Sequence, residues 1–213
     1  MKASIKNLLK SGLRGILAFI RKTRLGSLAS DMFIEQAMND YLSVEHNGYL
    51  LRFSVPNRLC RWRAETFSSK EPETIEWIDT MSNGAVLWDI GANVGLYTIY
   101  AARARNCEVY AFEPSVFNLE VLARNIFING CATAENTKTG RTVIVPLALS
   151  NRTTLNSMKL SATEWGGALS TFGENYGWDG LPIEETFEYG TMGIRIDDLN
   201  HFMAIPTPDF IKM

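Results

Sequence analysis

A glycine-rich turn between a short apolar run and a helical stretch constrains the fold of this chain more than any other feature. Residues 85–90 have the length and composition of a strand buried on both faces, and Gly91 and Gly95 follow them. Helix-like and strand-like segments then alternate over residues 94–105, 107–112, 115–129 and 142–149. The alternation predicts an α/β fold with a Rossmann-like, doubly wound parallel sheet, whose ligand crevice lies at the carboxyl ends of the strands.

The composition of the turn indicates what kind of ligand it binds. Asp89 stands just before Gly91, and the glycine spacing is G-x-x-x-G, which differs from the G-x-G-x-x-G of dinucleotide sites. A carboxylate at this position would repel a pyrophosphate and attract the ammonium and sulfonium groups of S-adenosylmethionine. The loop contains no lysine and no GKS or GKT follows it, which disfavours a nucleoside triphosphate. We therefore expect S-adenosylmethionine as the cofactor.

A second acid, at the end of the next predicted strand, supports the same ligand. Glu113 lies 18 residues beyond Gly95, where α/β nucleoside-binding proteins place an acid that accepts hydrogen bonds from the ribose hydroxyls. In the alternative interpretation, Asp89 caps the following helix and Glu113 is a solvated strand end. The joint spacing of the two acids favours the ligand-binding interpretation.

Two more residues are expected near the cofactor. Ala148, at the end of the third predicted strand, is small enough to let the adenine approach, although the segment is equally typical of a core strand. Tyr97, in the first turn of the helix after the glycines, would either reach the methionine moiety or pack in the core.

Several blocks of the sequence resemble the FkbM family of methyltransferases, over roughly residues 65–213. The most distinctive are Asp89-Ile90-Gly91-Ala92-Asn93-Val94-Gly95 and Ala111-Phe112-Glu113-Pro114. The others follow in the family's order: Lys70-Glu71-Pro72-Glu73-Thr74, Arg124-Asn125-Ile126-Phe127-Ile128-Asn129-Gly130, Pro146-Leu147-Ala148-Leu149-Ser150, Ile196-Asp197-Asp198-Leu199 and Asp209-Phe210-Ile211-Lys212.

The resemblance implies a class I methyltransferase that uses S-adenosylmethionine and methylates a hydroxyl of a sugar, glycan or natural product. It implies cofactor contacts from Asp89, Gly91, Asn93 and Glu113, and the first block also contains Ala92 and Gly95. In the family, the strand that matches residues 210–212 continues into Asp-Val-Glu-Gly and several more strands. We therefore expect a domain that is truncated at its C-terminal side.

The expected truncation leaves two alternatives to an active methyltransferase. One is a non-catalytic protein that binds S-adenosylmethionine, and the other is an NAD-dependent oxidoreductase, which Asp89 and the glycine spacing disfavour. Transfer to a hydroxyl benefits from a general base, and Lys212, at the acceptor end of its strand, is the candidate. Packing or solvated roles suit three nearby residues better: Asp197, Asp198 and His201. Ser170 lies in a segment that resembles a family Gly-Gly-x-Ser loop or is only a turn.

The N-terminal residues predict a basic amphipathic helix. Residues 1–24 contain seven Lys or Arg and no acid, and their apolar residues recur at helical spacing. The longest stretch without a charge is too short for a transmembrane span or a secretion signal. The helix either packs on the domain or a partner, or contacts an anionic membrane surface. We predict a leader over 1–30, a cap with a strand at 48–56 and a helix at 72–81 within 31–82, and the Rossmann-like domain over 83–213.

Charge and cysteine content narrow the expected partners. Residues 25–213 hold 14 basic and 23 acidic side chains, a formal charge of −9, which disfavours binding to nucleic acid. Three unevenly spaced cysteines and two histidines predict neither a disulfide framework nor a metal site. We expect a cytoplasmic protein that acts on a small-molecule or carbohydrate acceptor.

Overall fold

The N-terminal part of the chain forms a helical unit of its own. The computed structural model describes residues 2–132, 139–177 and 179–213, and the chain divides into two compact units, Met1–Asp40 and Tyr41–Met213. The first contains α1 (Lys2–Ile20) and α2 (Arg24–Asn39). The Thr23 side chain caps α2 by accepting a hydrogen bond from Gly26 N at 3.0 Å, so this helix begins within the predicted leader of residues 1–30 and continues beyond it. Among the described residues, no helix is both long and apolar enough to cross a membrane.

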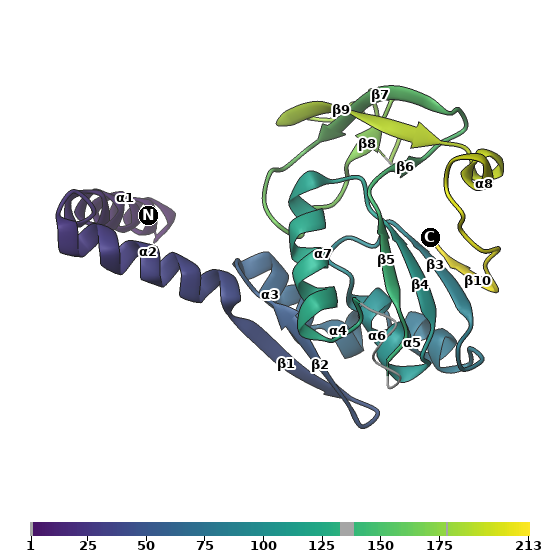
Figure 1. Ribbon diagram of the computed structural model, residues 1–213. Helices are drawn as coiled ribbons and strands as arrows, with labels where there is room; N and C mark the ends of the chain where they lie inside the picture. The colour runs from purple at the N-terminus through teal and green to yellow at the C-terminus, as the bar shows by residue number, and fades with distance from the viewer. Residues whose placement is uncertain (1, 133–138, 178) are drawn as a thin grey trace. The chain divides into compact units, whose positions relative to one another are not determined.

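The second unit is built on a parallel sheet (Figure 1). Within the described residues its strands lie in the order β10 (Phe210–Lys212), β3 (Val86–Ile90), β4 (Glu108–Phe112) and β5 (Thr142–Val145). The chain runs from β3 through β4 to β5 in one direction and later places β10 on the opposite side of β3. Strand order therefore reverses between β3 and β10, which is where open α/β sheets form their ligand crevice. The predicted α/β class with a Rossmann-like parallel sheet is confirmed.

Alternate side chains of the central strands face two separate apolar clusters. On one face, Leu87, Val109 and Ala111 pack with residues of the helices α5 (Pro72–Asp79), α6 (Leu96–Ala104) and α7 (Val116–Ile128). On the other face, Trp88, Tyr110 and Phe112 pack with residues of the segment that precedes β10, which contains a 3₁₀ turn (Ile196–Asp198) and α8 (Leu199–Phe202). Both faces are thus covered, and this accounts for the nearly unbroken apolar runs of β3 and β4.

A hairpin and two short helices precede the parallel sheet. The hairpin strands are β1 (Tyr41–His46) and β2 (Tyr49–Ser54), and β2 is the strand predicted over 48–56. Asn125 and Asn129, in and just after α7, fasten β2 to that helix, since their side-chain oxygens accept hydrogen bonds from Ser54 N at 2.7 Å and Arg52 N at 3.0 Å. The helices α3 (Arg58–Glu65) and α4 (Phe67–Lys70) follow and lead into α5.

The strand predicted over residues 142–149 is wrong beyond Val145. Pro146 has no N–H to continue the ladder, and the chain turns there, with Leu147 N donating to Val145 O at 2.9 Å. The next two residues form β6 (Ala148–Leu149), which pairs with β9 (Phe187–Ile194) in a second sheet. Pro146 therefore marks the point at which the chain passes from one sheet to the other.

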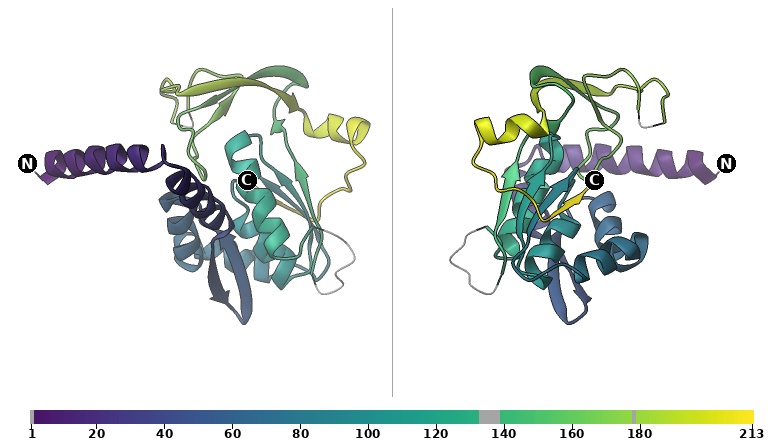
Figure 2. Two further views of the ribbon diagram at one scale, coloured as in Figure 1. Left: turned by 60° about the vertical axis from the view of Figure 1, so that its left-hand side comes forward. Right: turned by 90° about the vertical axis from the view of Figure 1, so that its right-hand side faces the viewer.

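The second sheet lies beyond the carboxyl ends of the parallel strands in Figure 1 and in both views of Figure 2. Its order is β6-β9-β7-β8, with β7 spanning Thr154–Leu160 and β8 spanning Thr171–Phe172. β7 and β9 pair antiparallel along seven residues. Residues 161–170, which connect β7 to β8, form a loop that belongs to this sheet and reaches the functional site described below.

Candidate functional site

The backbone of the glycine turn leaves open space at the carboxyl end of β3. Gly91, Asn93 and Gly95 have left-handed φ values of 72°, 53° and 82°. A Cβ on Gly95 would lie 2.4 Å from Leu122 Cδ1, so the glycine is needed for α6 and α7 to pack closely. A Cβ on Gly91 would meet nothing within 4 Å. The turn therefore combines tight packing behind it with an open side in front, beside the N-terminus of α6.

Asp89 is a buried carboxylate held between α6 and β10. Its side chain is 1% exposed, and its Oδ2 accepts a hydrogen bond from the Thr98 hydroxyl. Lys212 Nζ lies 3.1 Å from Asp89 Oδ1 and 5.4 Å from the centre of the Tyr97 ring. Asp89 Oδ1 nevertheless receives no well-directed hydrogen bond from the described residues. As an ammonium in this ion pair, Lys212 has no lone pair with which to accept a proton, so in this arrangement it holds Asp89 in place.

Glu113 joins the end of β4 to the glycine turn. Its two oxygens accept hydrogen bonds from Asn93 N at 2.7 Å and from Ser115 N at 2.8 Å, and the residue is 5% exposed. Burial raises the pKa of this carboxyl, against the lowering effect of the hydrogen bonds that it accepts. Each carboxylate oxygen can accept a second hydrogen bond, so Glu113 keeps acceptor capacity for a ligand hydroxyl.

The loop of residues 161–170 is fastened over the turn by side chains from three other regions. The loop carbonyls accept hydrogen bonds from the N-cap and body of α3: Asn57 Nδ2 donates to Trp165 O at 2.9 Å, and Arg63 Nε donates to Gly166 O at 2.9 Å. Gly167 O accepts from the glycine turn through Asn93 Nδ2 at 2.7 Å and from α7 through Asn118 Nδ2 at 3.0 Å. Asn118 Oδ1 also accepts from Gly166 N at 3.0 Å. The second sheet thereby supplies one wall of the site.

A cavity of about 240 Å³ lies between the glycine turn, the short helices and β10. Its lining combines turn backbone, aromatic rings and charged side chains: Arg63, Thr66, Phe67, Lys70, Glu71, Gly91, Ala92, Asn93, Val94, Leu96, Tyr97, Ala168 and Lys212. Five residues predicted as functional from the sequence are among them: Gly91, Ala92, Asn93, Tyr97 and Lys212. The other predicted residues among those described lie outside this lining: Asp89 and Gly95 directly behind the turn, Glu113 at the end of β4, and Ala148 in β6.

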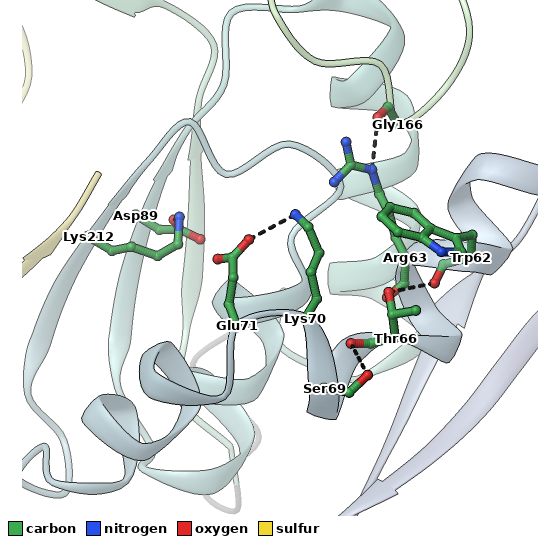
Figure 3. A network of polar contacts seen from close by, with 9 residues as sticks. All are labelled: Trp62, Arg63, Thr66, Ser69, Lys70, Glu71, Asp89, Gly166 and Lys212. Atoms are coloured by element: carbon green, nitrogen blue, oxygen red, sulfur yellow. Dashed lines mark hydrogen bonds and ion pairs between the residues drawn. The ribbon is translucent and has the colours of Figure 1, made fainter.

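Three charged residues of the cavity were missed as site residues in the sequence analysis (Figure 3). Lys70 and Glu71 form an ion pair at 2.8 Å, and Arg63 approaches from α3. Burial tends to raise the pKa of Glu71, but its hydrogen bond and charge interaction with Lys70, together with Tyr97 and Lys212, lower it overall. Burial and then Glu71 raise the pKa of the Tyr97 hydroxyl, which is therefore protonated at neutral pH. The Lys70-Glu71-Pro72 block was the available signal, since it stands just before a helix that the proline begins.

The remaining candidates for catalysis do not line the cavity. Asp197 is paired with Arg195 at 2.8 Å, and Asp198 accepts a hydrogen bond from Thr153. His201 is exposed in α8. Ser170 lies in the loop, two residues beyond the cavity-lining Ala168.

Comparison of the sequence with protein-family models and with curated proteins finds no match. Among solved structures, the chain is similar to M. jannaschii TYW2 in complex with AdoMet, with 21% identity over 49% of this chain and 42% of that chain and a TM-score of 0.35. It is also similar to the SAM-dependent methyltransferase from Agrobacterium tumefaciens, with 12% identity over 50% of this chain and 32% of that chain and a TM-score of 0.36. A third similar structure is precorrin-6y C5,15-methyltransferase from Geobacter metallireducens GS-15, with 21% identity over 38% of this chain and 37% of that chain and a TM-score of 0.28. The chain thus matches less than half of each of these proteins, and the fold assignment rests on the strand order described above.

Proposed function

We propose that this chain is an S-adenosylmethionine-dependent methyltransferase of class I. The observation that carries the proposal is the buried Asp89 carboxylate behind an open glycine turn, at the point where strand order reverses. An acid in this place favours a ligand with positive charge over a dinucleotide pyrophosphate. Asp89 Oδ1 is buried and, apart from its ion pair with Lys212, has no well-directed hydrogen bond, so it fits such a ligand.

The residues of the chain then divide the work of binding and orientation. When bound, S-adenosylmethionine supplies a methyl group that a nucleophile can attack in line. Glu113 would accept hydrogen bonds from the ribose, and the glycine turn would hold the ligand against the N-terminus of α6. Tyr97 and Lys212 lie next to each other in the lining of the same cavity, so they would orient the reacting groups.

We propose further that the acceptor is a hydroxyl of a sugar, glycan or natural product, as the resemblance to the FkbM family implies. Two features of the chain support a small acceptor over a nucleic acid. The charge of −9 over residues 25–213 would repel a phosphate backbone, and the cavity places an acidic side chain, Glu71, and aromatic rings beside its three basic side chains.

Calorimetric titration of the full chain with S-adenosylmethionine, S-adenosylhomocysteine and NAD tests the cofactor. We expect both adenosyl compounds to bind and NAD not to bind, whereas binding of NAD alone would favour an oxidoreductase. Asp89→Asn should weaken S-adenosylmethionine about tenfold or more, because the charged group that attracts its sulfonium and ammonium is lost. The matched control is Asp197→Asn, which removes the same charge from a side chain that is 78% exposed and outside the cavity.

Transfer of labelled methyl tests the activity and the acceptor class. We expect label to pass from S-adenosylmethionine into hydroxyl-bearing sugars, glycans or a natural-product extract, and not into transfer RNA offered at the same concentration. Label in RNA would overturn the acceptor proposal. Cofactor binding without transfer to any of these pools would instead identify a binding protein without this activity.

A further inference from the structure

The cavity contains a cation that forms no ion pair with the described residues. Arg63 lines the cavity, is partly buried, and uses Nε to donate to Gly166 O. Among the described residues, no carboxylate lies within ion-pair distance of its guanidinium, in contrast to Lys70 and Lys212, which are paired with Glu71 and Asp89. Figure 3 shows its two terminal nitrogens on the side of Lys70. The unpaired fork can therefore receive an anion from within the cavity.

Acidic groups lie on the opposite side of the same cavity. Glu71 lines it, and the buried Asp89 stands behind Lys212 (Figure 3). The backbone of the glycine turn, from Gly91 to Val94, also lines the cavity. A ligand in this space would meet the Arg63 guanidinium at one end, and toward the other the ion pairs of Glu71 with Lys70 and of Asp89 with Lys212.

This distribution of charge selects among ligand chemistries. A phosphate would place two negative charges close to Glu71 and Asp89, and a simple cation would meet Arg63 and Lys212. A zwitterion with a carboxylate and an ammonium on one carbon satisfies both ends. The amino-acid part of S-adenosylmethionine is such a zwitterion.

We propose that Arg63 binds the carboxylate of the cofactor's methionine moiety and that Glu71 faces its ammonium. The inference rests on the proposed function and assigns it two binding residues from outside the glycine turn. The planar fork of Arg63 matches the two oxygens of a carboxylate, and its Nε bond to Gly166 fixes the orientation of the fork. Arg63 thus connects recognition of the amino acid to the loop that covers the site.

The test compares two ligands that differ only in the amino-acid part. S-Adenosylhomocysteine carries the zwitterion, whereas 5′-methylthioadenosine keeps the adenosine and the sulfur without it. In the parent protein we expect S-adenosylhomocysteine to bind more tightly. Arg63→Gln should weaken S-adenosylhomocysteine by about tenfold to a hundredfold and leave 5′-methylthioadenosine within about twofold. Retained binding of 5′-methylthioadenosine also shows that the variant is folded.

Two further variants complete the design. Arg58→Gln removes the same charge from an exposed position of α3 outside the cavity, and it should change neither affinity. Arg63→Lys keeps the charge without the fork and should give an intermediate loss for S-adenosylhomocysteine alone. If Arg63→Gln weakens both ligands equally, or neither, the role of Arg63 is overturned while the cofactor proposal stands. If the parent protein binds neither ligand, the proposed function itself fails and this inference fails with it.

Discussion

The parallel and the antiparallel sheets of residues 41–213 differ in how their strands are buried. In β3 and β4, consecutive side chains such as Leu87, Trp88 and Asp89 are all buried, because both faces of that sheet are covered. In β7 and β9, exposed and partly buried positions predominate, and Leu155 is 70% exposed. The first sheet provides the strand ends that carry Asp89 and Glu113, and the second provides the covering loop. The site therefore depends on a sheet that is covered on both faces and on another that is joined to it by a smaller apolar contact, at Ile194, and by the hydrogen bonds of the loop.

The largest expected effect is the loss of stability when a core side chain of the parallel sheet is truncated. Leu87→Ala should lower the free energy of unfolding by about 3 kcal/mol, because Leu87 is 0% exposed and its truncation leaves a cavity between β3 and the helices. The same substitution at Leu155 in β7 should cost less than about 0.5 kcal/mol. Urea denaturation of both variants measures the difference. Equal losses would show that the two sheets contribute alike to the core, contrary to the comparison above.

A smaller effect is expected where the covering loop is attached. Asn118→Ala removes the bonds to Gly166 N and Gly167 O and leaves a buried N–H without its partner, so we expect a loss of about 2 kcal/mol. Affinity for S-adenosylhomocysteine should fall, and proteolytic cleavage within residues 161–170 should become faster.

The control for the attachment is Asn151→Ala, an exposed position just before β7, which should leave stability, affinity and cleavage unchanged. If Asn118→Ala leaves cleavage of the loop unchanged as well, the loop is held by other contacts than those described.

The smallest expected effect is a change in pH dependence at Glu113. Burial raises the pKa of this carboxyl above its ordinary value of 4.5, so the folded protein holds the proton to a higher pH than the unfolded chain does. The unfolded state then binds fewer protons in that window, and stability falls as pH rises from about 4.5 through the raised pKa. Glu113→Gln should abolish this contribution to the pH dependence of the free energy of unfolding, which urea denaturation at several pH values across the window measures.

Ligand binding at Glu113 should change with pH in the opposite direction. The ribose hydroxyls need the ionised carboxylate as acceptor, so affinity for S-adenosylhomocysteine should increase as pH rises through the same window. In Glu113→Gln the affinity should be lower and should lack this increase. A parent affinity that is constant over the window would contradict the ribose assignment.

The two sheets also differ in how well the sequence predicts them. β3, α6, β4 and α7 lie within the ranges predicted for them, since an apolar run or a helical period over a covered surface leaves a clear pattern. β6 was missed because Pro146 ends a run whose composition continues unchanged beyond it. The glycine-rich, β-prone pattern of residues 151–200 predicts hairpins and a long loop, but it is too polar to give the bounds of β7 to β9, because solvent covers much of that sheet.

The cavity was predicted only in part, for a related reason. Gly91, Asn93 and Asp89 belong to one contiguous block, which a sequence displays directly. Arg63 comes from an eight-residue helix whose place depends on packing of Cys60 and Ala64, and Asn118 meets the loop across 48 positions of the chain. Contacts at such separation depend on the tertiary structure, which local patterns do not encode.

The attachment of the covering loop links ligand binding to folding. Hydrogen bonds to residues 165–167 close chain loops of 48 to 108 residues, so the cavity exists only after both sheets have formed and met. A ligand that binds there interacts with the folded chain and not with the unfolded one, and it shifts the unfolding equilibrium by RT ln(1 + [L]/Kd). The melting temperature of residues 41–213 as a whole should therefore rise with the concentration of a ligand that contacts only one end of the parallel sheet.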